Sequence, residues 1–235
     1  MVRYGGITIE WLGHATIRIS DGETVAYIDP GRYGVLDGYP GGDGDVVCVT
    51  HNHHYDSDAI RRVAREDATV VAFEGINSHR IGRDVERLAA LPYDRRTVDD
   101  ESDIAVGDVI VRTTAAYNDP DGPHVRASGE PYHPTGLGCG YHVTIGGVRL
   151  FYPGDTDVLE GHDRLDVDVL CPPIGGTVTM DRHEAADLAV ALDPDLVVPV
   201  HYDTFEAIET DAEAFTAELA ARAVPVTLDG YSSLK

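Results

Sequence analysis

Histidine and aspartate side chains gather at three places where a strand-like segment of the chain ends. The apolar run DVVCVT leads into the first place, which is the stretch THNHHYD at residues 50–56. The runs VRLFYP and DLVVPV lead into the second and third places. The candidate metal ligands there are, in chain order, His51, His53, His54, Asp56, Asp155 and His201.

These residue types together predict a metal site. Imidazole nitrogens and carboxylate oxygens are ligands for Zn²⁺, and also for Mn²⁺ and iron. Taken alone, His201 is more typical of a hydrogen-bonded histidine, and Asp155 of a turn residue. Three such places at strand ends within one chain indicate a shared centre. We therefore expect one or two divalent ions, with Zn²⁺ first and Mn²⁺ or iron as alternatives.

Hydrophobic periodicity predicts the elements that would position this centre. Strands start each half of the chain, and helices interleave later, which favours two sheets with helices on their outer faces. We expect a four-layer αββα sandwich, with residues 1–235 as a single α/β domain. Residues 117–138, rich in Pro and Gly, predict a functional lid or a mobile segment. The predicted strands are 7–12, 15–20, 24–29, 45–50, 69–73, 108–117, 139–145, 148–153, 195–200 and 224–228, and the predicted helices are 58–66, 78–91, 181–192 and one within 204–222.

The charge of the chain is strongly negative. The formal net charge is -23 over 235 residues, and Lys235 is the only lysine. Carboxylates spread over the whole chain favour adaptation to very high salt, where a Debye length of about 3 Å at molar salt screens their repulsion. The same anionic surface argues against a nucleic-acid partner.

The remaining composition predicts a cytoplasmic protein. The chain carries no apolar run of membrane-spanning length, and its first residues lack the pattern of a signal peptide. Cys48, Cys139 and Cys171 lie in apolar runs and are expected to be reduced core residues. We expect a small-molecule substrate and no membrane partner, and a homo-oligomer is compatible with the sequence.

Five separated motifs resemble those of the metallo-β-lactamase-fold hydrolases, in the order found in that family. They are ITIEWLGHATIRI, YIDPG, THNHHYD, FYPGDTD and VVPVHYDTF. The late segments PPIGGTVTMDRHEAA and VVPVHYDTF resemble those of the branch that includes the L-ascorbate-6-phosphate lactonases. The resemblance implies that Asp155 bridges two metal ions and could accept a proton, and that His201 is the final histidine ligand. It also implies that Asp29, in the Asp-Pro turn, is a supporting residue, and His14 is a candidate for the same role.

The histidine-rich motif also departs from the family pattern. Without gaps, His51 and His53 match the first two histidines, Tyr55 falls on the family's aspartate, and Asp56 falls on its last histidine. A gapped register places His54 on that last histidine instead. We expect His54 or Asp56 to bind the second ion and Asp56 to be a candidate catalytic residue, while Tyr55 should not coordinate, because a neutral phenol is a poor ligand.

The resemblance also implies a third histidine ligand for the first metal ion, from the middle of the chain. Three residues are candidates for this position. We prefer His133 over His124, and both over Asn118, because neutral imidazole is the better zinc ligand. The other histidines are expected at the surface or in caps; these are His79, His142, His162 and His183.

The function predicted from these features is metal-assisted hydrolysis of a small ester, lactone or phosphoester. A non-catalytic metal-binding protein on the same fold is the main alternative, because the motif THNHHYD departs from the family pattern. A nuclease or phosphodiesterase is less favoured, because the chain has no basic surface.

Overall fold

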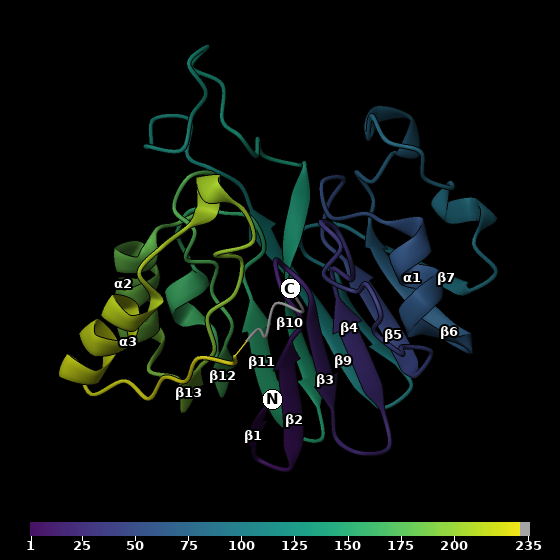
Figure 1. Ribbon diagram of the computed structural model, residues 1–235, viewed down its shortest axis with the longest axis horizontal. Helices are drawn as coiled ribbons and strands as arrows, with labels where there is room; N and C mark the ends of the chain where they lie inside the picture. Colours follow the sequence, from purple (N-terminus) through teal and green to yellow (C-terminus); the bar gives the residue numbers. More distant parts are fainter. Residues whose placement is uncertain (231–235) are drawn as a thin grey trace.

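The computed structural model describes residues 1–230 and contains two β-sheets that pack face to face (Figure 1). The first sheet follows chain order. Its strands are β1 (Val2–Tyr4), β2 (Ile7–Trp11), β3 (Ile17–Ser20), β4 (Val25–Ile28), β5 (Gly44–Val49), β6 (Ala64–Phe73) and β7 (Asp94–Val98). The second sheet has the order β13 (Leu196–Val197), β12 (Val169–Leu170), β11 (Val148–Tyr152), β10 (Gly138–Ile145), β9 (Val109–Ala116) and β8 (Asp103–Val106).

Within residues 1–230, three α-helices form the outer layers. The helix α1 (Ser57–Val63) lies on one side of the molecule, and α2 (Arg182–Leu192) and α3 (Ala212–Ala221) lie on the other (Figure 1). The expected αββα sandwich is therefore confirmed, with thin helical layers. Short 3₁₀-helices occur at Ser78–Arg80, Leu88–Ala90, His162–Arg164 and Glu206–Ile208. Within residues 1–230, no helix is long and apolar enough to cross a membrane.

Alternating side chains of the strands build the hydrophobic core. In β2 the residues Ile7, Ile9 and Trp11 are buried, while those between them are partly exposed, as a strand with one buried face requires. This core lies between the sheets and continues beneath α2 and α3. A second cluster packs Ile60 and Val63 of α1 against the other face of the first sheet.

The helix predicted over residues 78–91 is wrong. Only two 3₁₀ turns form there, and Gly82 between them has φ 68°, a conformation that breaks a helix. Two hydrogen bonds instead hold the segment to the start of α1 and the residues before it. The Glu86 carbonyl accepts from the Tyr55 hydroxyl at 2.8 Å, and the Glu86 N–H donates to the Ser57 hydroxyl at 3.0 Å. Tertiary contacts therefore override the helical pattern.

The strand predicted over residues 224–228 is also wrong. Val226 forms only an isolated bridge to Val197, since Pro225 has no N–H to donate to a ladder. The expected strand 195–200 shortens to β13 because Pro199 interrupts it. The predicted helix 58–66 ends at Val63, where β6 begins. The helix α2 begins at a capping box, in which Asp181 and Glu184 are bonded reciprocally.

Strand direction brings the predicted site segments to one edge of the sandwich. The strands β4, β5 and β6 are parallel, and so are β11, β12 and β13. His51 at the end of β5 forms an isolated bridge with Gly138 at the start of β10, which ties the two sheets together there. A Cβ on Gly138 would lie 2.6 Å from the His51 Cβ, so only glycine permits this approach.

Candidate metal centre

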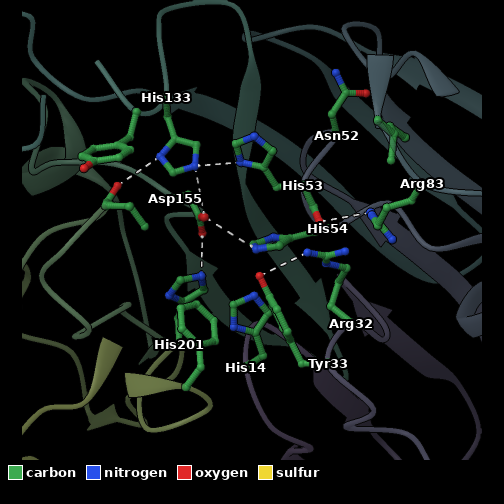
Figure 2. Close-up of a pocket in the computed structure, with 14 residues that line it drawn as sticks. His14, Arg32, Tyr33, Asn52, His53, His54, Arg83, His133, Asp155 and His201 are labelled. Atoms are coloured by element: carbon green, nitrogen blue, oxygen red, sulfur yellow. Dashed lines mark hydrogen bonds and ion pairs between the residues drawn. The ribbon is translucent and has the colours of Figure 1, made fainter. Parts of the chain in front are cut away.

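Asp155 lies at the centre of the converging segments. It follows β11 on a turn at Gly154, whose φ of 76° brings the turn against the Cys139 carbonyl. The Asp155 side chain is 5% exposed, and imidazoles from separate parts of the chain surround it (Figure 2). Its Oδ2 lies 3.3 Å from His133 Nε2, 3.5 Å from His54 Nε2 and 3.7 Å from His51 Nε2. Its Oδ1 lies 3.4 Å from His201 Nε2.

Two histidine clusters flank this carboxylate. The first cluster is His51, His53 and His133, and the second cluster is His14, His54 and His201. In each cluster, three possible ligand atoms lie within 4.8 Å of one another, and His51, His54 and Asp155 form a third such group between them. The structure thus brings together all the predicted ligands except Asp56, and it adds His14.

Asp29 and Thr50 orient two of the imidazoles. His54 Nδ1 lies 2.7 Å from the Asp29 carboxylate, to which an imidazole N–H can donate. The Thr50 hydroxyl also donates to Asp29 at 2.7 Å, so its oxygen is left to accept from His51 Nδ1 at 2.9 Å. In its neutral form, each ring then carries its proton on Nδ1 and leaves the lone pair of Nε2 facing Asp155. This is the arrangement by which a partner group prepares histidine for a metal.

The loop 117–138 positions His133 and is packed against the site. His133 Nδ1 donates to the Val178 carbonyl at 3.0 Å, which leaves Nε2 facing Asp155. Asn118 accepts from the His133 backbone N–H at 2.8 Å and supports the loop instead of joining a cluster. His124 is also held apart, because its Nδ1 bonds Asp157 at 2.6 Å and its Nε2 bonds the Gly176 carbonyl. Of the three candidates, His133 alone joins the first cluster.

Asp56 lies at the start of α1, where its carboxylate caps the helix. Its Oδ1 accepts from the backbone N–H groups of Asp58 at 3.1 Å and Ala59 at 3.0 Å. The geometry does not support Asp56 as a ligand or catalytic group, because capping and the Arg83 guanidinium, 3.8 Å away, engage its oxygens. Tyr55 points away as expected, with its ring buried under α1 and its hydroxyl bonded to Glu86.

Burial and neighbouring charges set the protonation of the centre. Burial, followed by the nearby His54, lowers the pKa of His51 well below its usual value, and burial lowers the pKa of His133 to about 4. Although burial opposes it, Asp155 and Asp29 raise the pKa of His54. Burial would raise the pKa of Asp155, but the imidazoles of His201 and His54 hold it well below its usual range. The centre therefore combines an anionic Asp155 with neutral imidazoles at His51 and His133.

These atoms fit a metal site. Two ligand atoms at about 2.0–2.1 Å from a tetrahedral zinc ion lie about 3.4 Å apart. The observed separations are 3.2 Å between His53 Nδ1 and His133 Nε2, and 3.3–3.7 Å from the imidazoles to Asp155. Within residues 1–230, buried His51 Nε2 and Asp155 Oδ1 have no hydrogen-bond partner. Buried polar atoms without partners are rare, and a metal ion would satisfy both.

A cavity of about 360 Å³ opens onto the centre. Side chains of the centre line this cavity, among them His53, His54, His133, Asp155 and His201 (Figure 2). Its walls are mixed, with the apolar side chains Ile81, Val178 and Phe205 beside Tyr33 and Tyr132. Arg32 and Arg83 also line it, and Asp155 is the only carboxylate among the described lining residues.

The backbone around the cavity is strained. His14, Asp29 and His201 have φ between 47° and 56°, a left-handed conformation that is uncommon for residues other than glycine. The His201 N–H donates to the His14 carbonyl at 2.8 Å, which fixes two of these residues against each other. Strained residues of this kind concentrate at functional sites. Sequence reasoning gave His14 only a supporting role, although its place just after β2 matches the strand-end signal used for His51 and His201.

Two other histidine predictions are wrong. His162 is 3% exposed and His142 is 6% exposed, so neither faces solvent. Their Nε2 atoms bond the backbone carbonyls of Ala115 and Asp166, at 3.2 Å and 2.9 Å, so both are buried structural residues. His79 and His183 are exposed, as expected.

Comparisons with known proteins identify the family. A model described as the Beta-lactamase superfamily domain matches residues 8–201. A UPF0173 metal-dependent hydrolase from Thermococcus kodakarensis is 32% identical, over 97% of this chain and 99% of its own length. The chain belongs to the UPF0173 metal-dependent hydrolases of the β-lactamase superfamily. A UPF0173 protein from Pyrococcus furiosus is 31% identical over 92% of each chain.

Solved structures support the fold of this UPF0173 hydrolase. Igni18, a metallo hydrolase from Ignicoccus hospitalis, matches with a TM-score of 0.69 and 18% identity over 94% of each chain. An isothiocyanate hydrolase from Delia radicum gut bacteria matches with a TM-score of 0.64 and 17% identity, over 95% of this chain and 96% of its own. At such identities the likeness concerns the fold alone. The resemblance to the L-ascorbate-6-phosphate lactonases stays a prediction.

Proposed function

We propose that this UPF0173 protein hydrolyses a small ester, lactone or phosphoester at a centre of two divalent ions, with Zn²⁺ preferred over Mn²⁺ or iron. The observation that carries the proposal is the position of Asp155, whose two carboxylate oxygens face imidazoles of both clusters at 3.3–3.7 Å. A carboxylate in that position can bind two ions at once. When bound, such ions act as Lewis acids and lower the pKa of a coordinated water toward neutrality.

In this proposal each cluster would hold one ion. The first ion would be held by His51, His53 and His133, and the second by His14, His54 and His201. Asp155 would belong to both sets of ligands, and Asp56 is left as a helix cap. Nitrogen and carboxylate donors of this kind suit zinc, and do not exclude manganese or iron.

The chain's own residues would also orient the substrate and move a proton. Asp155 is the candidate proton acceptor, because no other carboxylate lines the described cavity. The volume of about 360 Å³ is at the low end of the range for small-molecule sites, which favours a compact substrate. The apolar side chains of the lining, including Ile81 and Phe205, would help to exclude water from the bound substrate.

Metal content and hydrolysis of three variants test this proposal. Purified in molar potassium chloride, the wild type should contain two ions per chain by elemental analysis. His51→Ala and His201→Ala should each lose metal and reduce hydrolysis of an active ester, lactone or phosphoester about a hundredfold or more. His79→Ala is the matched control, because His79 is an exposed imidazole outside both clusters. Unchanged metal content in both cluster variants would refute the assignment.

A non-catalytic metal-binding protein is the second candidate. It is favoured by the position of Asp56, which caps α1. Among the described residues that line the cavity, Asp155 is then the one carboxylate for both metal binding and proton transfer. The same experiment separates the two functions. Two bound ions with no hydrolysis across the three substrate classes would support the second candidate over the first.

A further inference from the structure

Two arginines line the cavity beside the centre. Arg32 comes from the loop after β4, and Arg83 comes from the segment between the 3₁₀-helices Ser78–Arg80 and Leu88–Ala90. Figure 2 shows both guanidinium groups on the same side of the cavity as His54. In a chain with net charge -23, the two arginines that line the cavity make the charge there locally positive beside the single carboxylate of Asp155 among the described lining residues.

The structure already accounts for Arg83. Its Nη2 donates to the Tyr55 carbonyl at 2.7 Å and lies 3.3 Å from the His53 carbonyl. Its Nη1 is 3.8 Å from the Asp56 carboxylate. Arg83 therefore holds the histidine-rich loop in place, and its donors are largely engaged in that role.

Arg32 is engaged less, and its guanidinium lies over the Tyr33 ring, 4.5 Å from the ring centroid. Among residues 1–230, no carboxylate lies within 4.0 Å of its guanidinium, although the chain has 41 acidic residues. Its Nη2 donates to the hydroxyl of Tyr33 at 3.1 Å, while its Nε is buried without a hydrogen-bond partner in the described structure. A buried guanidinium donor left unsatisfied is costly, so a ligand that supplies acceptor oxygens would be favoured there.

The backbone that presents Arg32 is itself unusual. Four consecutive residues, Gly31 to Gly34, have positive φ, and Arg32 and Tyr33 are at 68° and 51°. Gly31 is fixed by a hydrogen bond from its N–H to the Thr16 hydroxyl at 3.0 Å, and it packs so closely on α1 that a Cβ would collide with Ala59. The loop therefore holds Arg32 at the cavity with a left-handed backbone conformation that residues with a side chain rarely adopt. Such strain is expected at a functional position.

We propose that Arg32 is a specificity-determining residue that binds an oxyanion group of the substrate, either a carboxylate or a phosphate. The guanidinium fork matches both groups with two parallel hydrogen bonds. The substrate class of this hydrolase is thus narrowed to small molecules that carry an anionic group beside the bond to be cleaved. This inference rests on the proposed function for the cleaved bond, but anion binding can be measured without any hydrolysis.

Calorimetric titration with two simple anions tests the role of Arg32. Wild type, Arg32→Gln, Arg32→Lys and the control Arg164→Gln are titrated with inorganic phosphate and with acetate at one potassium chloride concentration, with metal content recorded. Arg164 is a suitable control because its side chain is 72% exposed and lies outside the cavity. A melting curve in the same buffer establishes that each variant is folded.

Arg32→Gln should bind the preferred anion about tenfold more weakly than wild type, Arg32→Lys should recover part of the affinity, and Arg164→Gln should match wild type. The anion that wild type binds with the higher affinity shows whether the substrate group at Arg32 is a phosphate or a carboxylate. The inference is overturned if wild type binds neither anion, or if Arg32→Gln binds both as tightly as wild type. Anion binding through Arg32 without hydrolysis would leave the inference standing and remove only the proposed function.

Discussion

The carboxylates of Asp29 and Asp56 both follow strand ends, yet they act in different ways. Asp29 accepts from His54 and Thr50, and so sets the tautomer of imidazoles that face Asp155. Asp56 is turned toward the first N–H groups of α1 and away from the clusters. A sequence motif gives the type and spacing of such residues but not the direction of each side chain. The direction depends on whether a helix begins at the next residue.

Substitutions at residues 54 and 56 separate these roles. Asp56→Asn should keep both metal ions and most of the capping, because asparagine is nearly as good a cap as aspartate. Asp56→Ala should also keep the metal but lower the free energy of unfolding by about 1 kcal/mol. His54→Ala should lower metal content without a comparable capping defect. Elemental analysis and denaturant unfolding measure the two effects, and loss of metal in Asp56→Asn would return Asp56 to the ligand set.

At the scale of the elements, the loop 117–138 brings His133 to the first cluster. Asp157 anchors that loop, because it accepts from Asn118 Nδ2 at 2.9 Å, from the Asp119 N–H at 2.8 Å and from His124. The segment predicted as a lid or mobile region is therefore tied down at several points around His133.

Removing the anchor should weaken the first metal site from a distance. Asp157→Ala should speed amide hydrogen exchange in residues 117–138 and lower metal affinity, although Asp157 lies in neither histidine cluster. The loss expected is about tenfold or more, as for other supporting residues of metal sites. Asp121→Ala is the matched control, since Asp121 is exposed in the same loop. Equal exchange rates and equal metal affinity in the two variants would contradict this role for the loop.

The strands next to the site were largely predictable, and the peripheral elements were not. The strands that end near His51 and Asp155 are mostly apolar, so their pattern predicts both the strand and the edge at which it ends. Residues 78–91 have a helical pattern, but contacts of Glu86 with α1 and Tyr55 prevent the helix. His14 was undervalued because a single histidine after a strand carries little signal until the fold places it beside His201.

At the scale of the whole molecule, charge is the dominant feature. The net charge of -23 comes from 41 acidic residues against 18 lysines and arginines. Ion pairs at the surface, such as Arg65 with Asp45, compensate only part of it, and exposed pairs contribute little to stability. The excess carboxylates should repel one another when they are not screened. Adaptation to high salt, a cytoplasmic location and a single domain over residues 1–235 stay predictions.

Stability should therefore rise with salt. The melting temperature should increase between low and molar potassium chloride, because the Debye length falls from about 10 Å at 0.1 M to about 3 Å at 1 M. Matched titrations with potassium chloride and potassium sulfate separate screening from the general stabilisation that sulfate gives. A melting temperature that is flat or falling in potassium chloride would remove the halophilic interpretation.

The central claim is that two ions share Asp155 between the two histidine clusters. Anomalous diffraction at the absorption edges of zinc, manganese and iron, from crystals grown with metal, tests it most directly. We expect two anomalous peaks on either side of Asp155, one contacted by His51, His53 and His133 and the other by His14, His54 and His201. A single peak, or a second peak bound by Asp56 in place of His54, would contradict this account.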